Sequence, residues 1–497
     1  MELKYLVLLA VIGAVTAGKH DVYEGNSVHD VQLRSTADQK FLFEMEDQLE
    51  LDIWEHGMPG VREARVMVSA QNRVAFLDAL DSEGIEHYVH LTNVPEALEK
   101  FDEEQRIWSA GRSNRMIFDN FPRYNEINSY METIAQRHPN LVTVVTAGKS
   151  FEGRDIKYLK ISTTNFNDPS KPIYFMNAMI HAREWVTTPV TLYSIHRLVD
   201  NVRHEDYDLR NDVDWIILPL VNPDGYEYTH THERLWRKTR SYYPEVNATC
   251  YGVDGNRNFD IMFNTLGVSS NPCVNTYPGH VAFSELETQY IRDILQEYKD
   301  RIQIYMDIHS HGNYVLFGYG DASLTANAPQ LHHVGAAMGA AIDARKLDKA
   351  RYYLVGNSAS VLYATSGSAQ DYGQSVGVPF SYTLELPGYE YSFQVPARYQ
   401  DQINEETWQG IAASARLAKL YYASRLVTTT PAPTAAPTAA PTAAPTAAPT
   451  AAPTAAPTAA PTAAPTAAPT AAPTVAPTVA PTAAPTAAPT AAPTAYA

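Results

Sequence analysis

The chain has no excess of positive charge, and it has no long hydrophobic run beyond its first residues. Its 497 residues include 38 Lys and Arg against 55 Asp and Glu, which gives a net charge of −17. No charged residue follows residue 427, so all of this negative charge lies on the first 427 residues. An acidic, solvated surface does not attract nucleic acid or anionic lipid, and we expect neither as a partner.

The one marked hydrophobic run, at the N-terminus, is typical of a signal peptide. Lys4 is the basic start, residues 6–15 are the apolar core, and Thr16 and Ala17 are small residues before a cut. The core is too short to span a bilayer; the alternative is a buried N-terminal helix. The sequence does not end in a hydrophobic tail, and this argues against a lipid-anchor signal. We therefore expect residues 1–17 to be a leader and the protein to be secreted, extracellular and without a membrane span.

Cysteine is also scarce, with only Cys250 and Cys273 in the chain. A pair of cysteines fits an oxidising compartment if the two form a disulfide, and the alternative is two buried free thiols. The leader favours the paired state.

The C-terminal stretch, residues 425–497, has almost nothing but Pro, Thr and Ala from Thr428 onward, in a four-residue repeat. Proline at every fourth position forbids a helix, and the composition cannot build a core. We expect a disordered, extended stalk. Dense Thr beside Pro indicates mucin-like O-glycosylation and association with mucus or matrix, and the alternative is a passive linker.

Residues 18–112 have the size and pattern of a small α+β open sandwich. Residues 65–70 and 87–91 are strand-like and residues 96–108 helix-like, and Val74, Leu77 and Leu80 share one face of another helix. A generic α+β binding module is the alternative to a more specific role.

Residues 113–424 alternate between strand-like and helix-like stretches. The predicted strands are residues 142–147, 156–162, 173–180, 215–221, 301–308 and 380–384. Ile127, Tyr130, Met131 and Ile134 form a helical stripe, Ser284 and Glu287 form a capping box for a helix that ends near residue 298, and residues 403–426 form the last helix. This alternation predicts an α/β fold, a mixed-sheet α/β/α sandwich.

Three of these strands deliver ionisable residues at their carboxyl ends. His181 follows one strand, with Glu184 three residues later; His309 ends a second strand and Glu385 a third. Open α/β sheets place their chemistry at this edge. Alone, a His-x-x-Glu pair is more often a solvated pair than a metal site, but a third ligand makes a zinc site with an open position for water.

The motifs around these residues resemble those of zinc metallocarboxypeptidases of the pancreatic carboxypeptidase A/B type, in proenzyme form. The matching segments are His181-Ala182-Arg183-Glu184, Arg234-Leu235-Trp236-Arg237-Lys238-Thr239-Arg240, Asp254-Gly255-Asn256-Arg257-Asn258-Phe259, Asp307-Ile308-His309-Ser310, Leu362-Tyr363-Ala364 and Thr383-Leu384-Glu385-Leu386. They occur in the family's order and cover roughly residues 19–424.

The resemblance implies one Zn²⁺ per chain and hydrolysis of the C-terminal peptide bond. His181, Glu184 and His309 would hold the metal. Glu385 would be the general base and then the proton donor to the leaving amine. Arg237 would stabilise the oxyanion, with Arg240 as the alternative because the spacing after it is longer than in the family.

Five further residues receive roles from the same resemblance. Asn256 and Arg257 would hold the terminal carboxylate of a peptide substrate, since an arginine fork meets a carboxylate with two hydrogen bonds. Tyr363 would close over the bound end, and Arg183 would contact the peptide backbone further in. Asp254 would orient a ligand histidine.

The resemblance also implies how the chain is processed. Residues 18–112 would be an activation peptide that caps the active site of the catalytic domain, residues 113–424. A polar, basic connection ends the small domain, and it suits an activating trypsin-like protease that cuts after Arg112 or Arg115. The family has a disulfide at the positions of Cys250 and Cys273.

The chain departs from the family at Gln370, the position that sets which side chain is accepted. An apolar residue there accompanies aromatic and aliphatic ends, and Asp accompanies Lys and Arg. Ser358, Thr365 and Ser368 fall in the same pocket by their spacing. A buried ammonium needs a partner charge, so we predict release of neutral C-terminal residues.

Three other functions compete with this one. A catalytically silent peptide binder would lack a ligand or the base, whereas all four residues are present. A structural mucin would depend on the tail, which is about a seventh of the chain. A processing carboxypeptidase for basic ends usually lacks an activation domain.

Overall fold

The computed structural model describes residues 18–111 and 115–429, with side chains through residue 426. The predicted signal peptide, Arg112 and the tail from residue 430 onward lie outside the described residues. The described residues form two sheets, one of four strands and one of eight.

The small sheet belongs to the N-terminal residues, here called the small domain. Its elements are β1 (Ser27–Val31), α1 (Thr36–Leu49), β2 (Asp52–Glu55), β3 (Ala64–Val68), α2 (Arg73–Ser82), β4 (His87–Leu91) and α3 (Val94–Ala110). The strand order is β2-β3-β1-β4, and all pairs are antiparallel. The sequence did not predict β1, α1 and β2, because β1 and β2 contain buried polar residues that break the alternating pattern.

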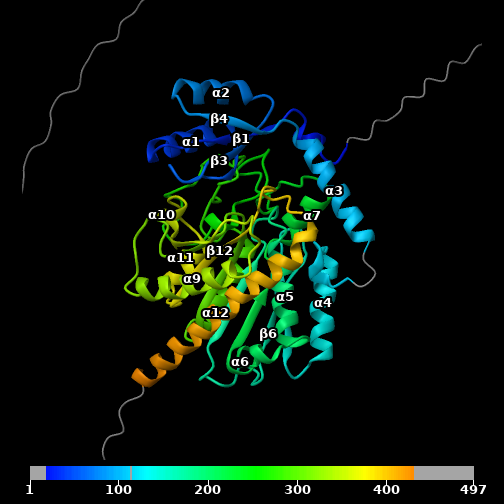
Figure 1. Cartoon of the computed structure of the whole chain (residues 1–497), viewed down its shortest axis with the longest axis vertical. Helices are drawn as coiled ribbons and strands as arrows, with labels where there is room; N and C mark the ends of the chain where they lie inside the picture. Colours follow the sequence, from blue (N-terminus) through cyan, green and yellow to red (C-terminus); the bar gives the residue numbers. More distant parts are fainter. Residues whose placement is uncertain (1–17, 112–114, 430–497) are drawn as a thin grey trace, which may run out of the picture. The chain divides into compact units, whose positions relative to one another are not determined.

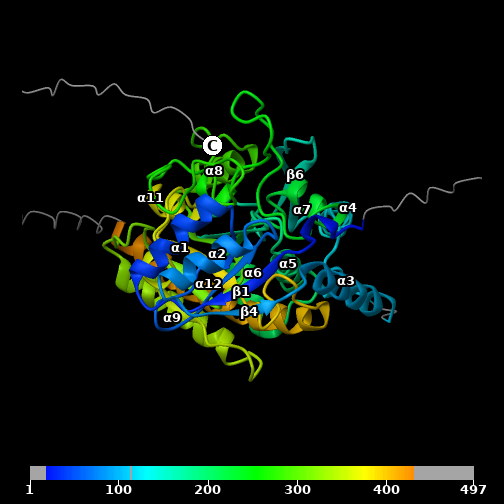
Figure 2. The ribbon, with the colours of Figure 1, turned by 90° about the horizontal axis from the view of Figure 1, so that it is seen from above.

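Helices α1 and α2 cover one face of the small sheet (Figures 1 and 2). Val66 and Val68 of β3 pack there against Phe76 and Leu80 of α2. The predicted helical face with Val74 was wrong in part, since Val74 is 68% exposed. Phe76, which is fully buried, takes the place in the core that we assigned to Val74.

The opposite face of the small sheet packs on the large domain. Val28, Trp54 and Met67 share one buried cluster with Leu235 and Phe393 of the large domain. Successive side chains of a strand point to opposite faces, so Met67 of β3 faces the large domain while Val66 and Val68 face the helices.

The large domain is built on the eight-stranded sheet. Its strands, in spatial order, are β11 (Leu354–Asn357), β10 (Tyr314–Phe317), β12 (Phe380–Leu386), β9 (Ile302–Ser310), β7 (Ile173–Ala178), β8 (Asp214–Leu218), β6 (Asp155–Ile161) and β5 (Val142–Lys149). The neighbours β12, β9, β7 and β8 are parallel, and β10 with β12, β6 with β8 and β5 with β6 are antiparallel. This is the mixed sheet that the sequence predicted.

Helices cover both faces of the large sheet. The helices α4 (Tyr124–Arg137), α5 (Thr187–Val199), α9 (Ala328–Asp343) and α12 (Gln400–Thr429) pack on one face, with α12 beside α9 and α5 (Figure 1). The helices α8 (Leu286–Tyr298) and α11 (Ala369–Ser375) pack on the other. Tyr174 and Met176 of β7 face the first layer, and Ile173 and Phe175 face the second.

The predicted capping box of α8 was wrong. The residue before the helix is Glu285, and its side chain makes no capping hydrogen bond. Ser284 instead donates its hydroxyl to Glu285 and accepts a hydrogen bond from Asn258. These bonds tie the start of α8 to the loop that carries Asn256 and Arg257.

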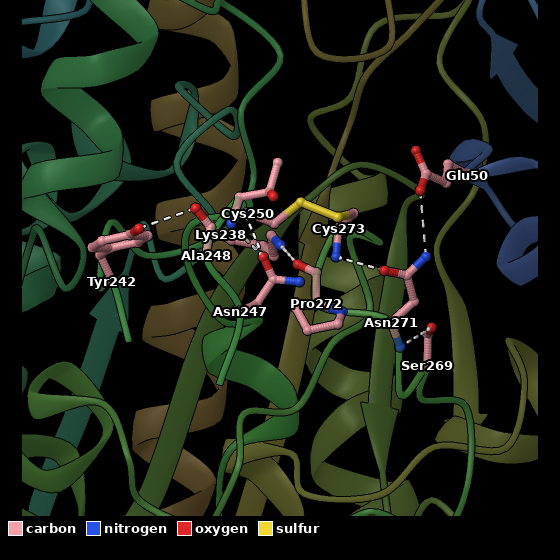
Figure 3. Close-up of a disulfide and its surroundings, with 11 residues drawn as sticks. Glu50, Lys238, Tyr242, Asn247, Ala248, Cys250, Ser269, Asn271, Pro272 and Cys273 are labelled. Carbon is pink, nitrogen blue, oxygen red and sulfur yellow. Dashed lines mark hydrogen bonds between the residues drawn. A yellow bond between two sulfur atoms is a disulfide. The ribbon is translucent and has the colours of Figure 1, made fainter. Parts of the chain in front are cut away.

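The loop between α7 (Pro223–Thr231) and α8 is closed by a disulfide between Cys250 and Cys273 (Figure 3). The backbone N–H of Cys273 donates to Asn271, whose amide in turn donates to Glu50 of the small domain at 3.4 Å. The disulfide therefore fixes a loop that contacts both domains. Among the described residues, no helix is both apolar and long enough to cross a membrane.

Candidate active site

Two strands of the parallel part of the large sheet bring together His181, Glu184 and His309. His181 and Glu184 lie just after β7, and His309 lies near the end of β9. All three side chains are buried, and one ligand atom from each lies within 4.8 Å of the others. The Glu184 carboxylate is 2.7 Å from His181 Nδ1 and 3.1 Å from His309 Nδ1.

The outer nitrogens of both imidazoles are held by buried carboxylates. His181 Nε2 is 2.9 Å from Asp254, and His309 Nε2 is 2.7 Å from Asp307. An ionised carboxylate accepts a hydrogen bond from Nε2–H, so the proton of each neutral imidazole stays on Nε2 and the lone pair of each Nδ1 is directed at the same point. Two imidazole nitrogens and one carboxylate, with no fourth protein ligand in the set, fit a catalytic zinc ion.

Asp307 has a positioning contact that we did not predict from the sequence. Its other oxygen accepts a 2.6 Å hydrogen bond from Asn177 of β7, so Asp307 joins the two strands that carry the ligands. The signal was present: Asp307 precedes His309 by two residues in a strand, and residues at that spacing share a face.

Charges around the triad favour ionised carboxylates. Burial opposes ionisation, but the imidazoles of His181 and His309 hold the pKa of Glu184 below its usual range. Burial likewise opposes the ionisation of Asp254, but Arg237 and His181 hold its pKa well below the usual range.

Glu385 lies near the end of β12, in register with His309 of the neighbouring strand. It lines the same groove as the triad. Its Oε2 atom is buried and has no hydrogen-bond partner among the described residues. Burial raises the pKa of Glu385 to about 8, and a bound divalent cation nearby would favour its ionised form.

Arginine 237 lines this groove, and Arg240 does not. The Arg237 guanidinium donates to Asp254 at 2.8 Å and lies 4.0 Å from Glu184. The Arg240 guanidinium instead stacks on Tyr228, 3.7 Å from the ring centre. Of the two alternatives, only Arg237 lines the groove that holds the triad.

Asn256 and Arg257 lie in the short helix η4 (Gly255–Arg257) and also line the groove. Arg257 donates to the Tyr363 hydroxyl at 2.6 Å, and Asn256 accepts a 2.8 Å hydrogen bond from the backbone N–H of Ala369. A Cβ atom at Gly367 would lie 2.2 Å from the Arg257 carbonyl oxygen, so glycine permits this close approach.

Part of the groove lining is uncharged. It consists of Leu316 and of five polar residues, Ser358, Thr365, Ser368, Gln370 and Thr383. Gln370 donates to the Gly318 carbonyl. The neighbouring Asp371 accepts a 2.8 Å hydrogen bond from Gly320, and burial raises its pKa to about 6. The side chain of Asp371 does not belong to the lining.

The small domain covers the groove with the segment of residues 52–56, here called the covering segment. Arg183, which we expected to contact peptide backbone, is bonded through one nitrogen to both oxygens of Asp52, at 2.7 and 2.8 Å. Trp54 packs edge-on against Phe393, and the His56 ring lies 3.9 Å from the Tyr363 ring. Arg183 and Tyr363 are therefore both occupied by the small domain.

Comparison with known proteins agrees with this geometry. Residues 127–410 match the family model described as zinc carboxypeptidase, and residues 29–101 match that of the carboxypeptidase activation peptide. Residues 461–496 match a model described as a PT disordered repeat.

Relatives and a solved structure match along most of the chain. A carboxypeptidase B of Helicoverpa zea is 43% identical over 84% of this chain and 99% of its own length. Bovine carboxypeptidase A1 is 30% identical over 82% of this chain and 96% of its own length. The crystal structure of a carboxypeptidase A from Helicoverpa armigera has a TM-score of 0.78 and 44% identity, covering 81% of this chain and 99% of that one. The chain belongs to the zinc carboxypeptidase family and has the domain organisation of a proenzyme, with an activation peptide before the catalytic domain.

Proposed function

We propose that the protein is a secreted metallocarboxypeptidase that is made inactive and, once cut, releases single residues from the carboxyl ends of peptides. The observation that carries the proposal is the convergence of the triad, Glu385 and Arg257 in one groove that the covering segment blocks. We place the leader at residues 1–17, the activation domain at 18–112, the catalytic domain at 113–424 and the tail at 425–497.

Substrate binding would begin at the free carboxylate. Arg257 presents a planar fork that can meet both carboxylate oxygens, and the Asn256 amide can add a further hydrogen bond. Tyr363 already contacts Arg257, so its ring lies where it can close over a bound C-terminal residue. Once the small domain has left, Arg183 would be free to donate to a peptide carbonyl.

The chemistry would take place between Glu385 and Arg237. A zinc ion held by His181, Glu184 and His309 would polarise a water molecule and the scissile carbonyl. Glu385 would take a proton from the water and pass it to the leaving amine. The Arg237 guanidinium would stabilise the negative charge that develops on the carbonyl oxygen.

We also propose that the released residue is neutral. This part of the lining offers hydroxyls, an amide and Leu316, and the neighbouring Asp371 is not among the lining residues. An ammonium or guanidinium placed there would lose its hydration without gaining a charge partner.

A panel of peptides that differ only in the last residue tests this specificity. We expect peptides ending in Phe, Leu or Gln to be cut faster than those ending in Lys, Arg or Glu. Fastest release of Lys or Arg would overturn the neutral preference while leaving the carboxypeptidase activity intact.

For the tail, we propose O-glycosylation and a role in retention in mucus or matrix, because threonine beside proline dominates its sequence. Deletion of residues 430–497 should leave peptidase activity unchanged and abolish binding to mucin-coated surfaces. A loss of activity in the deleted protein would contradict this accessory role.

A further inference from the structure

The turn where the large domain begins contains a buried carboxylate bonded to a backbone nitrogen. Asp119, in the short helix η2 (Ile117–Asp119), accepts a 3.0 Å hydrogen bond from the N–H of Met116. Asp119 is only 7% exposed. This nitrogen belongs to the peptide bond between Arg115 and Met116, and Arg115 is one of the two candidate cleavage residues.

The residues after Met116 are firmly anchored, so this nitrogen has little freedom to move. Phe118 is 5% exposed and packs against the rings of Tyr193 and His196 of α5. Its carbonyl accepts a 2.9 Å hydrogen bond from Asn404 of α12. Only Ile117 lies between Met116 and this anchor, so the anchor restrains the position of the Met116 nitrogen.

The bond before Met116 is accessible, although the carboxylate behind it is buried. Arg115 is exposed, and Met116 is 43% exposed. Exposed, polar connections between domains are the preferred sites of proteolytic cleavage. A trypsin-like protease accepts Arg at the position before the cut.

We propose that activation cuts the bond between Arg115 and Met116 and that the new α-ammonium of Met116 forms an ion pair with Asp119. Hydrolysis adds the hydroxyl of water to the Arg115 carbonyl and a proton to the Met116 nitrogen, which takes a second proton from solvent near neutral pH. The donor to Asp119 thereby changes from an uncharged amide to an ammonium, so that both partners of the hydrogen bond carry charge. A cut after Arg112 would leave the Met116 nitrogen in an amide and create no such pair.

The proposed cut lies close to the hydrogen bonds that join helix α3 of the small domain to this turn. Trp108 of α3 donates to the carbonyl of Asp119, and Asn120 donates to Ser109 at 2.6 Å. The new ion pair holds the turn in place when α3 leaves. The turn is thus fixed from within the large domain in the mature enzyme.

The proposal rests on the proteolytic activation described above, and its first test separates the two. The full chain is treated with trypsin, and both the peptidase activity and the N-terminal sequence of the large fragment are followed. We expect a stable product that begins at Met116. A stable active product that begins at Ser113 would overturn the proposal alone, whereas a product without activity on any peptide would overturn the proposed function.

Two variants of the cleavage residues sharpen this test. Arg115→Gln should slow the appearance of the Met116 terminus at least tenfold, and Arg112→Gln should not change its rate. Equal slowing by the two variants would contradict a cut at Arg115.

The ion pair has a test of its own in the reactivity of the new α-amine. A free α-amine has a pKa of about 7.7–8.0, and each unit of increase makes the reactive neutral form about tenfold scarcer at pH 7. We expect an amine-acylating reagent to label Met116 of the cut protein about tenfold more slowly than the synthetic peptide of residues 116–121. Equal rates would overturn the ion pair, and this comparison needs no variant.

Asp119→Asn in the cut protein should restore the labelling rate of the free peptide. Glu126→Gln is the matched control, because Glu126 accepts the backbone N–H of Arg123 in a similar capping arrangement one helix later. We expect the control to label at the wild-type rate. An Asp119→Asn protein that labels as slowly as the wild type would contradict the pairing.

Discussion

The metal-ligand histidines, on the floor of the groove, and the polar groups of the small domain above it, here called the cover, differ in how they are hydrogen-bonded. On the floor, each ligand histidine bonds a carboxylate, Asp254 or Asp307, from its own domain. In the cover, Nδ1 of His56 is buried with no hydrogen-bond partner among the described residues, and the carboxyl of Glu46 on α1 is buried with its pKa raised by burial to about 8.

This difference indicates which of the two surfaces can keep its geometry after the small domain leaves. Ligand histidines bonded in this way are preorganised and keep their geometry when the small domain leaves. A cover with unsatisfied or neutralised polar groups costs free energy to keep in place, and buried ion pairs such as Asp52 with Arg183 must hold it. The cover is therefore a removable part of the molecule.

The largest effect is expected on the floor, from Glu385→Gln. The amide cannot take a proton from water, so kcat should fall by roughly 10²–10⁴-fold. Zinc content should not change, because Glu385 is not one of the triad. Glu390→Gln, at an exposed residue paired with Lys349, is the control and should keep full activity. Retained activity in Glu385→Gln would refute its role as the base.

Removal of a floor carboxylate should be the next largest effect. Asp307→Asn weakens the hold on the outer nitrogen of His309, and we expect zinc affinity to fall by about 10–100-fold. Competition with a chelator of known affinity measures this change. Asp321→Asn, in an exposed loop, should bind zinc normally. Unchanged zinc affinity in Asp307→Asn would show that the hydrogen bond from His309 to Asp307 does not position this ligand.

On the cover, Asp52→Asn should loosen the closed state. Loss of this charge leaves Arg183 buried without its carboxylate partner, at a cost of about 2 kcal/mol or more, which is about a thirtyfold change in an equilibrium. Activity of the uncut protein on a short peptide should rise by about that factor. Glu44→Gln, at an exposed residue of α1, should leave the uncut protein silent. An equally silent Asp52→Asn protein would show that the cover does not depend on this pair.

The smallest effect should come from Glu46→Gln and should depend on pH. Burial raises the pKa of Glu46 from about 4.5 to about 8, with Arg237 and Arg257 opposing the shift and Asp52 and Asp254 adding to it. A raised pKa means that the folded state favours the neutral acid, so Glu46 does not destabilise the protein below about pH 4.5 and does so increasingly as the pH rises to about 8.

We therefore expect the thermal midpoint of uncut Glu46→Gln, relative to the wild type, to rise by a few degrees between pH 5 and pH 8. Thermal unfolding across this range measures the difference, and a constant difference between the two proteins would contradict a neutral Glu46. Glu44→Gln serves again as the exposed control and should show no pH-dependent difference.

Much of the large domain could be predicted because its strands are long apolar runs that end in chemically distinctive residues. The runs before His181, His309 and Glu385 correspond to β7, β9 and β12, and they meet at one edge of the sheet. Which of Arg237 and Arg240 lines the groove could not be predicted, because the spacing does not define the path of the loop that carries them.

The small domain was harder to predict for a physical reason. Its strand β2 contains Asp52 and Glu55, both buried, and their partners Arg183 and Arg351 lie far away in the sequence. A strand whose polar residues are neutralised by another domain has no hydrophobic alternation of its own. For the same reason the sequence did not predict that Arg183 pairs with Asp52, because this contact exists only where the two domains pack together.

The most direct measurement of the central claim is the peptidase activity of the intact and the trypsin-cut protein, each with bound zinc quantified and each with and without a chelator. We predict that both forms hold one zinc ion per chain, that only the cut form releases C-terminal residues, and that the chelator abolishes this release. A cut protein that holds zinc and releases nothing from any peptide, or an uncut protein that is already fully active, would contradict the claim of a covered and preorganised zinc site.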